Sequence, residues 1–208
     1  MDTSPPNPPV VAPLLSPARA ATRQKLIAAA IDLATEGGYE AVTVRTVAAR
    51  AEVSVPTAYQ HASSKDQLLV EALLELGGRS TAGVQQRRPA GDSPADRVSD
   101  VFRRIMAQVA DKPLLYQAMY RAFVAWGPAL PEGIGFGPER AAWIGAALRA
   151  GDTQGHSEES LDEAASILSC MFLGAMVSVT TGRPIPEVLE VLITTVHRLL
   201  PSSGNQPK

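Results

Sequence analysis

The chain has 208 residues, of which 45% are hydrophobic and 19% are charged, with a formal net charge of −2. This is the composition of an ordinary soluble globular protein of one large or two small domains, and it excludes a polycation. The charge is uneven: residues 19–88 hold nine Lys or Arg against seven Asp or Glu, a net of +2, and residues 89–208 hold ten against thirteen, a net of −3. A mildly basic front on an acidic body fits a modular DNA-binding protein but does not identify one.

Both ends of the chain, residues 1–17 and 203–208, are predicted to be tails. The first of them contains six prolines and no basic residue. A secretory signal needs a positive start and a continuous apolar stretch, so this segment is interpreted as a disordered, proline-rich tail. The longest apolar run, residues 167–179, is shorter than the roughly 20 residues of a membrane span. The sequence therefore favours a cytoplasmic protein without a membrane contact.

Cys170 is the only cysteine in the chain. A single thiol excludes an intrachain disulfide and fits a reducing compartment. Its neighbours Leu168, Met171 and Phe172 are apolar. A small core residue is therefore favoured over a redox sensor at this position.

The first predicted helix covers residues 18–36. Its apolar residues recur at helical spacing, and Gly37-Gly38 is expected to end it. Two short helices follow, each starting after a hydroxyl cap: Thr43 before the first and Ser54 before the second. Val47 lies on the apolar face of the first short helix, so that helix can pack on a neighbour.

Ser64 is predicted to cap a fourth helix that continues to about residue 87. A break follows over residues 89–94, and the domain boundary is placed near the start of this fourth helix. Apolar periodicity predicts further helices over residues 94–109, 113–126, 138–149, 158–181 and 186–200, with residues 127–137 as a loop. No strand pattern is found. The expected fold is all-α, with an N-terminal three-helix domain over residues 18–65 and a larger helical domain over residues 66–202.

The predicted helix over residues 158–181 is apolar on nearly every side beyond Ile167. Such a helix must be covered on two faces, only one of which its own subunit supplies. Small residues lie on it at Gly174, Ala175 and Ser178, and the last helix is also apolar. These two helices are therefore predicted to form the interface of a homodimer.

The two short helices have the form of a helix-turn-helix. The second is too short and too polar to be a core helix, and it carries donors of modest size, among them Thr57, Tyr59, Gln60 and His61. A helix-turn-helix requires one helix held against the body and one offered to the major groove of DNA. The sequence therefore predicts an N-terminal DNA-binding domain.

Residues 19–70 resemble the DNA-binding domain of tetracycline-repressor (TetR) family transcription regulators. The agreeing residues are Gly38-Tyr39-Glu40-Ala41-Val42-Thr43-Val44-Arg45, Val47-Ala48, Val53-Ser54, Thr57, Tyr59-Gln60-His61 and Ser64-Lys65. The later helices also fit the plan of that family, which has about nine helices, a ligand domain, and a dimer formed by the last two. Two positions depart from the family pattern: Glu52 stands where glycine is common, and Ala62 where phenylalanine is common.

The resemblance implies roles in binding double-stranded DNA. The implied phosphate contacts are Thr43, Arg45, Tyr59, His61 and Lys65. The implied base contacts are Val55, Pro56 and Thr57, and Ser54 and Gln60 complete the predicted DNA-binding set. Phosphate contacts fix register and groove-facing side chains read sequence, and the methyl groups of Val55 and Thr57 suit a thymine methyl.

A narrower resemblance concerns two stretches, residues 36–42 and 113–124. They are similar to the corresponding parts of actinobacterial repressors of sterol catabolism, which respond to a steroid coenzyme A thioester. The predicted ligand-binding residues are Phe102, Met106, Met119, Phe123, Trp143, Leu168, Met171, Phe172 and Met176, with plain core packing as the alternative for each. Methionine and aromatic side chains suit an adaptable apolar cavity. Arg121 is expected to form a surface salt bridge rather than to meet an acidic ligand group.

No histidine or cysteine pair has metal-ligand spacing, and no nucleophile motif, phosphate loop or dinucleotide fingerprint occurs. Neither an enzyme, a metal site nor a cofactor is expected. The favoured function is a homodimeric, ligand-responsive repressor that binds a palindromic operator, is nucleoid-associated when bound, and is released by a lipophilic effector. The alternative is a helical lipophile-binding or interaction protein whose DNA-binding head is impaired by Glu52 and Ala62.

Overall fold

The computed structural model describes residues 16–126 and 138–201. Over these residues the secondary structure is helical, without a strand, so the expected all-α fold class is confirmed. The helices are α1 (Pro17–Ala41), α2 (Val44–Arg50), α3 (Val55–His61), α4 (Lys65–Gln86), α5 (Pro94–Asp111), α6 (Pro113–Trp126), α7 (Pro138–Leu148), α8 (Glu158–Thr180) and α9 (Ile185–Leu199). The predicted tail over residues 1–17, apart from residues 16–17, the predicted tail over residues 203–208, and the loop expected over residues 127–137 lie outside the described residues.

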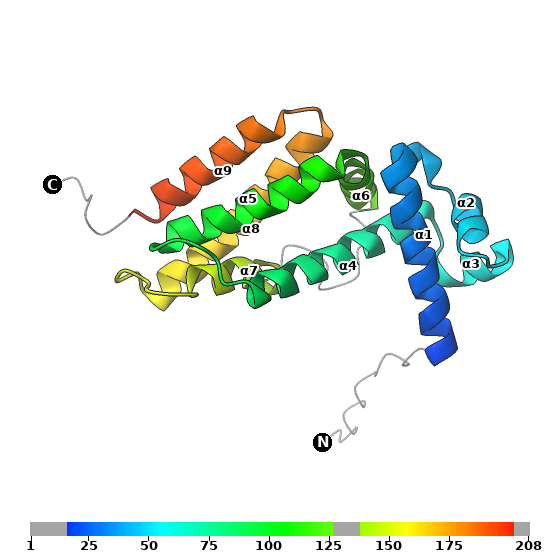
Figure 1. Cartoon of the computed structure of the whole chain (residues 1–208), viewed down its shortest axis with the longest axis horizontal. Coiled ribbons are helices and arrows are strands. Elements are labelled where there is room, and N and C mark those ends of the chain that lie inside the picture. The colour runs from blue at the N-terminus through cyan, green and yellow to red at the C-terminus, as the bar shows by residue number, and fades with distance from the viewer. Residues whose placement is uncertain (1–15, 127–137, 202–208) are drawn as a thin grey trace, which may run out of the picture.

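The helices divide into a small head and a larger body (Figure 1). Helices α1, α2 and α3 form the head at one end of the molecule, and α5, α7, α8 and α9 form the far part of the body. The head is held by α1, which packs on both α4 and α6. Because α4 begins at the head and runs into the body, it belongs to both units, close to where the sequence placed the boundary.

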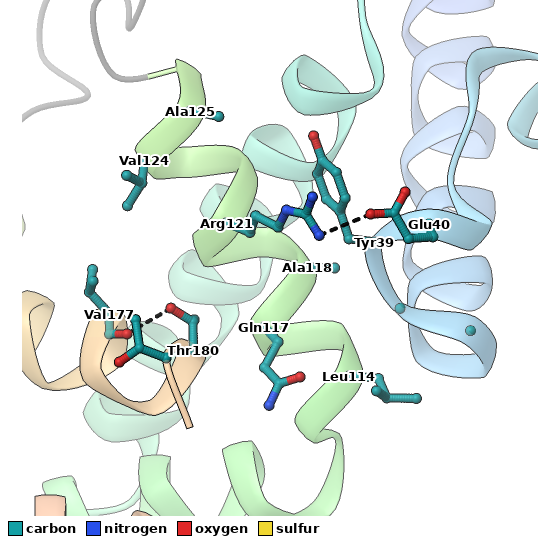
Figure 2. A pocket seen from close by; sticks show the side chains of 13 residues that line it. Tyr39, Glu40, Leu114, Gln117, Ala118, Arg121, Val124, Ala125, Val177 and Thr180 are labelled. Carbon is teal, nitrogen blue, oxygen red and sulfur yellow. Dashed lines mark hydrogen bonds and ion pairs between the residues drawn. The ribbon is translucent and has the colours of Figure 1, made fainter. Parts of the chain in front are cut away.

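Helix α1 extends farther than predicted, to Ala41, across a kink at Gly37-Gly38. Gly38 has a φ of 66°, a left-handed conformation that glycine adopts without steric cost. The two glycines therefore interrupt the helix as predicted, but the chain resumes a helical turn beyond them. This turn carries Tyr39 and Glu40 toward α6 (Figure 2).

A continuous apolar core joins head and body. Leu26 of α1, Val47 of α2 and Ala58 of α3 are fully buried in the head, and so are Leu68 and Leu69 of α4 to within 1%. Full burial of one such leucine contributes about 1.5–3 kcal/mol. The first turns of α4 thus take part in the core of the head.

The far end of the body is held by a buried arginine. Arg97 of α5 is 2% exposed, and its guanidinium donates to the carbonyls of Ala147 and Leu148, the last residues of α7, at 3.2 and 2.7 Å. It also donates to the carbonyls of Asp92 and Asp152 at 3.3 and 2.9 Å. Arg97 therefore satisfies carbonyls that the end of α7 leaves without helical partners.

Helix α8 is long and apolar enough to cross a membrane, yet only 28% of its most apolar window is buried within the subunit. It packs on α6, α7 and α9, as a helix of a helical body does. Ile167 remains 39% exposed, and Gly174 of the same stripe is exposed. Cys170 lies on this stripe and is exposed, so its predicted burial in the core of the subunit was wrong. The apolar neighbours that favoured burial belong partly to a face that the subunit does not cover.

Candidate DNA interface and junction groove

The start of α2 is fixed by a reciprocal cap. The hydroxyl of Thr43 accepts from the amide of Thr46 at 3.0 Å, and the hydroxyl of Thr46 accepts from the amide of Thr43 at 2.9 Å. Val47 and Ala48 bury the opposite side of the helix. As a result Arg45, in the first turn, is exposed, as is Thr43. Backbone amides at such a helix start also attract anions, which suits a phosphate contact.

Helix α3 packs on the rest of the head through small alanine side chains. Ser54 caps it by accepting from the amide of Thr57 at 3.2 Å, and the two hydroxyls lie 2.7 Å apart. Ala58 is fully buried, and the side chain at Ala62 is 2% exposed, so the small residue at this position is itself part of the core. These small side chains let α3 lie close to the rest of the head.

Six of the ten predicted DNA-binding residues lie on α3, and three of these six are exposed. Tyr59 is 57% exposed, and Pro56 and Gln60 are exposed as well. Val55, Thr57 and His61 are half-buried. The structure therefore gathers the predicted residues of α3 on a short helix that points away from the body, as Figure 1 shows for the helix itself.

An ion pair connects α2 to α1. The guanidinium of Arg50 donates to both carboxylate oxygens of Glu36, each at 2.8 Å. This hydrogen bonding, together with the positive charge, holds the pKa of Glu36 below its ordinary value and raises that of Arg50. Arg50 thus helps to position α2 on α1.

Lys65, which the sequence predicted only as a phosphate contact, also has contacts within the protein. Its ammonium donates to the carbonyl of Tyr39 at 3.2 Å and lies 3.7 Å from the centroid of the Tyr39 ring. It is also 3.8 Å from a carboxylate oxygen of Glu40, and its side chain is 25% exposed. Lys65 is therefore held by the last turn of α1 while keeping part of its side chain open to solvent.

The predicted ligand-binding residues lie in the body. Phe102, Met106, Met119, Leu168 and Met176 are at most 1% exposed, Phe123 is 7% exposed, and Trp143, Met171 and Phe172 are half-buried. Three of them meet: the Phe102 ring stacks on Phe172 with centroids 5.4 Å apart, and Trp143 approaches both rings edge-on at 5.9 and 5.3 Å. The structure thus brings α5, α7 and α8 together through aromatic side chains.

A groove of about 630 Å³ lies elsewhere, where head and body meet (Figure 2). This junction groove is lined by residues 37–40 of α1, by the end of α8, and by Leu114, Gln117, Ala118, Arg121, Val124 and Ala125 of α6. None of the nine predicted ligand-binding residues lines it. Arg121 lies in the wall of this groove, and its predicted surface salt bridge is confirmed with Glu40 at 3.0 Å.

The fold and this interface define a two-domain, all-helical DNA-binding regulator with a helix-turn-helix head. Residues 26–72 match the family of bacterial regulatory proteins of the tetR type, and residues 91–199 match the tetracyclin repressor-like C-terminal domain. The chain belongs to the TetR family of transcriptional regulators. Proteins of these families are DNA-binding regulators and not enzymes, so this chain is not an enzyme.

Individual relatives agree with this assignment. The chain is 31% identical to the HTH-type transcriptional repressor KstR of Mycolicibacterium smegmatis over 93% of each chain. It is 39% identical to KstR of Rhodococcus jostii over 53% of this chain and 51% of that protein. A TetR transcriptional regulator from Rhodococcus sp. RHA1 has a similar structure, with a TM-score of 0.71 and 25% identity over 89% of this chain and 99% of that one.

Proposed function

We propose that this TetR-family regulator is a homodimeric repressor whose two α3 helices read a palindromic operator and whose DNA affinity is lowered by a lipophilic effector. The observation that carries the proposal is the presentation of α3, which is packed through Ala58 and Ala62 and exposes Tyr59 and Gln60 on its outer face. Regulators of this family bind DNA operators and typically dimerise. We expect the protein to work in the cytoplasm and to be nucleoid-associated when bound.

The DNA-binding residues divide by their place on the head. Thr43, Arg45, Tyr59, His61 and Lys65 are proposed to contact phosphates. Val55, Pro56 and Thr57 are proposed to face bases from the first turn of α3, with Ser54 and Gln60 beside them. The exposure of Arg45 and Tyr59 supports the first group, and the position of Thr57 in the first turn of α3 supports the second. A phosphate-binding frame around a few base-facing side chains is the usual arrangement of a helix-turn-helix.

We propose that a second copy of this chain packs on the exposed apolar face of α8 and α9. Ile167 of α8 and Val191 of α9 are 39% and 44% exposed, and the window of α8 that is apolar enough for a membrane is mostly uncovered in one subunit. The face contains no acidic or basic residue of α8 beyond Glu163. A two-fold axis through such a face would place two recognition helices about one turn of DNA apart.

The effector is proposed to be a large lipophilic molecule, with a steroid or acyl-coenzyme A thioester as the specific class. The apolar side chains of α5, α6, α7 and α8 support an apolar site, and the aromatic group formed by Phe102, Trp143 and Phe172 suits a flat ligand. The resemblance of residues 113–124 to repressors of sterol catabolism supports the same class.

Selection of bound duplexes from random DNA tests the operator. The expected outcome is enrichment of an inverted repeat, with binding that weakens steeply as salt rises because phosphate contacts release counterions. Enrichment of a site without two-fold symmetry would contradict the dimeric reading. Absence of any salt-dependent retention on DNA would favour the alternative, a lipophile-binding protein with an impaired head.

Thermal-shift measurements test the effector class. The panel contains a steroid coenzyme A thioester, a long-chain acyl-coenzyme A, free coenzyme A and small polar metabolites. We expect stabilisation by the thioesters and much less by free coenzyme A, since the apolar group supplies most of the burial. The same thioester should then release the selected duplex. Stabilisation by polar metabolites alone would refute the lipophilic effector and leave the DNA-binding assignment intact.

A further inference from the structure

Tyr39 is the centre of a cluster of charged side chains between head and body, of which Figure 2 shows Glu40 and Arg121. Its hydroxyl donates to the carboxylate of Asp66 in α4 at 2.6 Å. Its ring receives two cations: the Lys65 ammonium at 3.7 Å and the Arg121 guanidinium at 4.0 Å from the centroid. One aromatic side chain therefore connects the end of α1 with the start of α4 and the middle of α6.

The hydroxyl of Tyr39 acts as a fixed donor. Burial first, and then the hydrogen bond to the Asp66 carboxylate, raise the pKa of Tyr39 to about 12, so the phenol stays protonated near neutral pH. An aromatic ring attracts a cation within about 6 Å of its centroid, and the attraction does not require the cation to give up other partners. The ring can therefore hold both Lys65 and Arg121 while each cation keeps a carboxylate or phosphate contact of its own.

Glu40 stands between these two cations. One of its carboxylate oxygens is 3.0 Å from the Arg121 guanidinium, and the other is 3.8 Å from the Lys65 ammonium. The contact with Arg121 is a hydrogen-bonding distance and the contact with Lys65 is not. The ion pair of Glu40 with Arg121 is therefore the stronger of the two. Glu40 and Lys65 are nevertheless close enough to form a hydrogen bond after a small side-chain movement.

We propose, on the basis of the phosphate contact assigned to Lys65 above, that Glu40 is an exchangeable counter-ion. Its pairing with Arg121 keeps the carboxylate from pairing more closely with Lys65, so that the Lys65 ammonium can reach a DNA phosphate. Arg121 is then a positioning residue for DNA binding, although it lies on a helix of the body. Withdrawal of Arg121 from Glu40 lets the carboxylate pair with Lys65, which neutralises that ammonium and weakens its hold on a phosphate. A movement of α6 would in this way lower DNA affinity by changing the charge pairing of Lys65, without displacing α3.

The surroundings of Arg121 allow such an exchange. Its side chain is 58% exposed and that of Glu40 is 74% exposed, so neither is locked in place by packing. Both line the junction groove, which gives the guanidinium open space beside the Tyr39 ring. Exposed ion pairs contribute modestly, which suits a partner that has to be given up and regained.

The test is a mutant cycle on the affinity for the duplex recovered by selection. We expect Arg121→Gln to weaken binding about two- to fivefold at low salt, and to lower the slope of log affinity against log salt by up to about one unit. The decisive comparison repeats the substitution in a Glu40→Gln background, where no carboxylate is left to capture Lys65. There Arg121→Gln should change neither the affinity nor the slope.

Two controls accompany this cycle. Arg183→Gln removes the same charge from an exposed arginine of the body that pairs with Glu187 rather than with Glu40, and it should leave DNA binding unchanged. Thermal unfolding of every variant shows whether the head remains folded. An equal loss from Arg121→Gln with and without Glu40 would overturn the proposal, because it would show a structural role for Arg121 alone.

The phosphate contact of Lys65 is tested separately by Lys65→Met. A lower salt slope in this variant, with Arg121→Gln then having no further effect, is the result expected from the exchange of Glu40. An unchanged slope in Lys65→Met would instead refute the phosphate contact assigned under the proposed function. The two failures are therefore distinguishable by experiment.

Discussion

The backbone amide of Val53 donates to the carbonyl of Ala48 at 3.0 Å, across the turn that separates α2 from α3. Inside this turn the amide of Glu52 donates to the carbonyl of Ala49 at 3.2 Å, and Glu52 has a φ of 57°. This pair of bonds forms a Schellman turn, whose left-handed position is usually glycine. The departure of Glu52 from the family pattern is therefore a matter of backbone strain as well as of charge.

The first prediction follows from this strain. A non-glycine residue in the left-handed region costs roughly 1–2 kcal/mol, and glycine loses roughly 0.5–1 kcal/mol more chain entropy on folding. We expect Glu52→Gly to stabilise the protein by about 0.5–1 kcal/mol, measured by denaturant unfolding. Glu52→Gln, which keeps the strain and removes the charge, should not stabilise it. Equal stability of the two variants would show that the turn is relaxed.

The second prediction concerns phosphate binding by the head. Arg45 is exposed at the start of α2, so Arg45→Gln should lower the salt slope by about 0.9 if one phosphate contact is lost. Tyr59→Phe should weaken binding about equally for all sequences, since it removes a phosphate donor and not a base contact. Arg183→Gln, at an exposed arginine of the body that pairs with Glu187, serves as the charge-matched control. A change of sequence preference in Tyr59→Phe would contradict its assignment to phosphate.

The third prediction places the dimer interface on α8. Ala175 is half-buried in the subunit, and Ala175→Glu would put an unpaired charge into the interface. Sedimentation should then show monomers with an unchanged helix content. Ala28→Glu, at an exposed position of α1, should remain dimeric. A dimeric and folded Ala175→Glu variant would mean that the subunits meet elsewhere.

The fourth prediction uses the exposed thiol of Cys170 as a reporter of the same face. Because Cys170 shares a stripe of α8 with Ile167 and Gly174, a second copy should shield it. We expect slow alkylation in the wild-type protein and faster alkylation in the Ala175→Glu variant. Cys170→Ala should keep its affinity for DNA and its response to the effector. Loss of a peroxide response in that variant would restore the redox-sensor interpretation.

The fifth prediction concerns acid stability through Asp96. The hydroxyl of Ser93 donates to the Asp96 carboxylate at 2.6 Å and, as the largest cause, holds the pKa of Asp96 below its ordinary value of 3.8. A depressed folded pKa stabilises the protein above the unfolded pKa, and this contribution is lost as pH falls through the lower folded value. Ser93→Ala should cost about 1 kcal/mol at neutral pH. Its unfolding free energy should also fall less than that of wild type as the pH is lowered from neutral to below the ordinary Asp pKa of 3.8.

Local signals explain what the sequence predicted well. Thr43 and Ser54 start helices because a hydroxyl next to an apolar periodicity is a short-range pattern, and the DNA-binding head is built from such patterns. The contacts of Tyr39 could not be predicted from such short-range patterns. Its partners Asp66 and Arg121 lie 27 and 82 residues farther along the chain, and only the packing of α1 on α4 and α6 brings them together.

The exposure of Cys170 was missed for another physical reason. Apolar neighbours indicate that a side chain is removed from water, but they do not say whether its own subunit or a second one removes it. The sequence therefore identified the uncovered face of α8 and, at the same time, assigned its cysteine to the core. The junction groove escaped prediction because its walls come from three helices distant in sequence.

The four carbonyls bound by Arg97 have a mechanical consequence for the body. They come from the segment before α5 and from the end of α7 and the segment after it, so one buried side chain clamps both connections at the end remote from DNA. Gly151 completes this clamp, since a Cβ there would lie 3.1 Å from the guanidinium. If the proposed effector expands the body, this clamp holds one end together, and the expansion is expected to move the opposite end, at α1 and the first turns of α4.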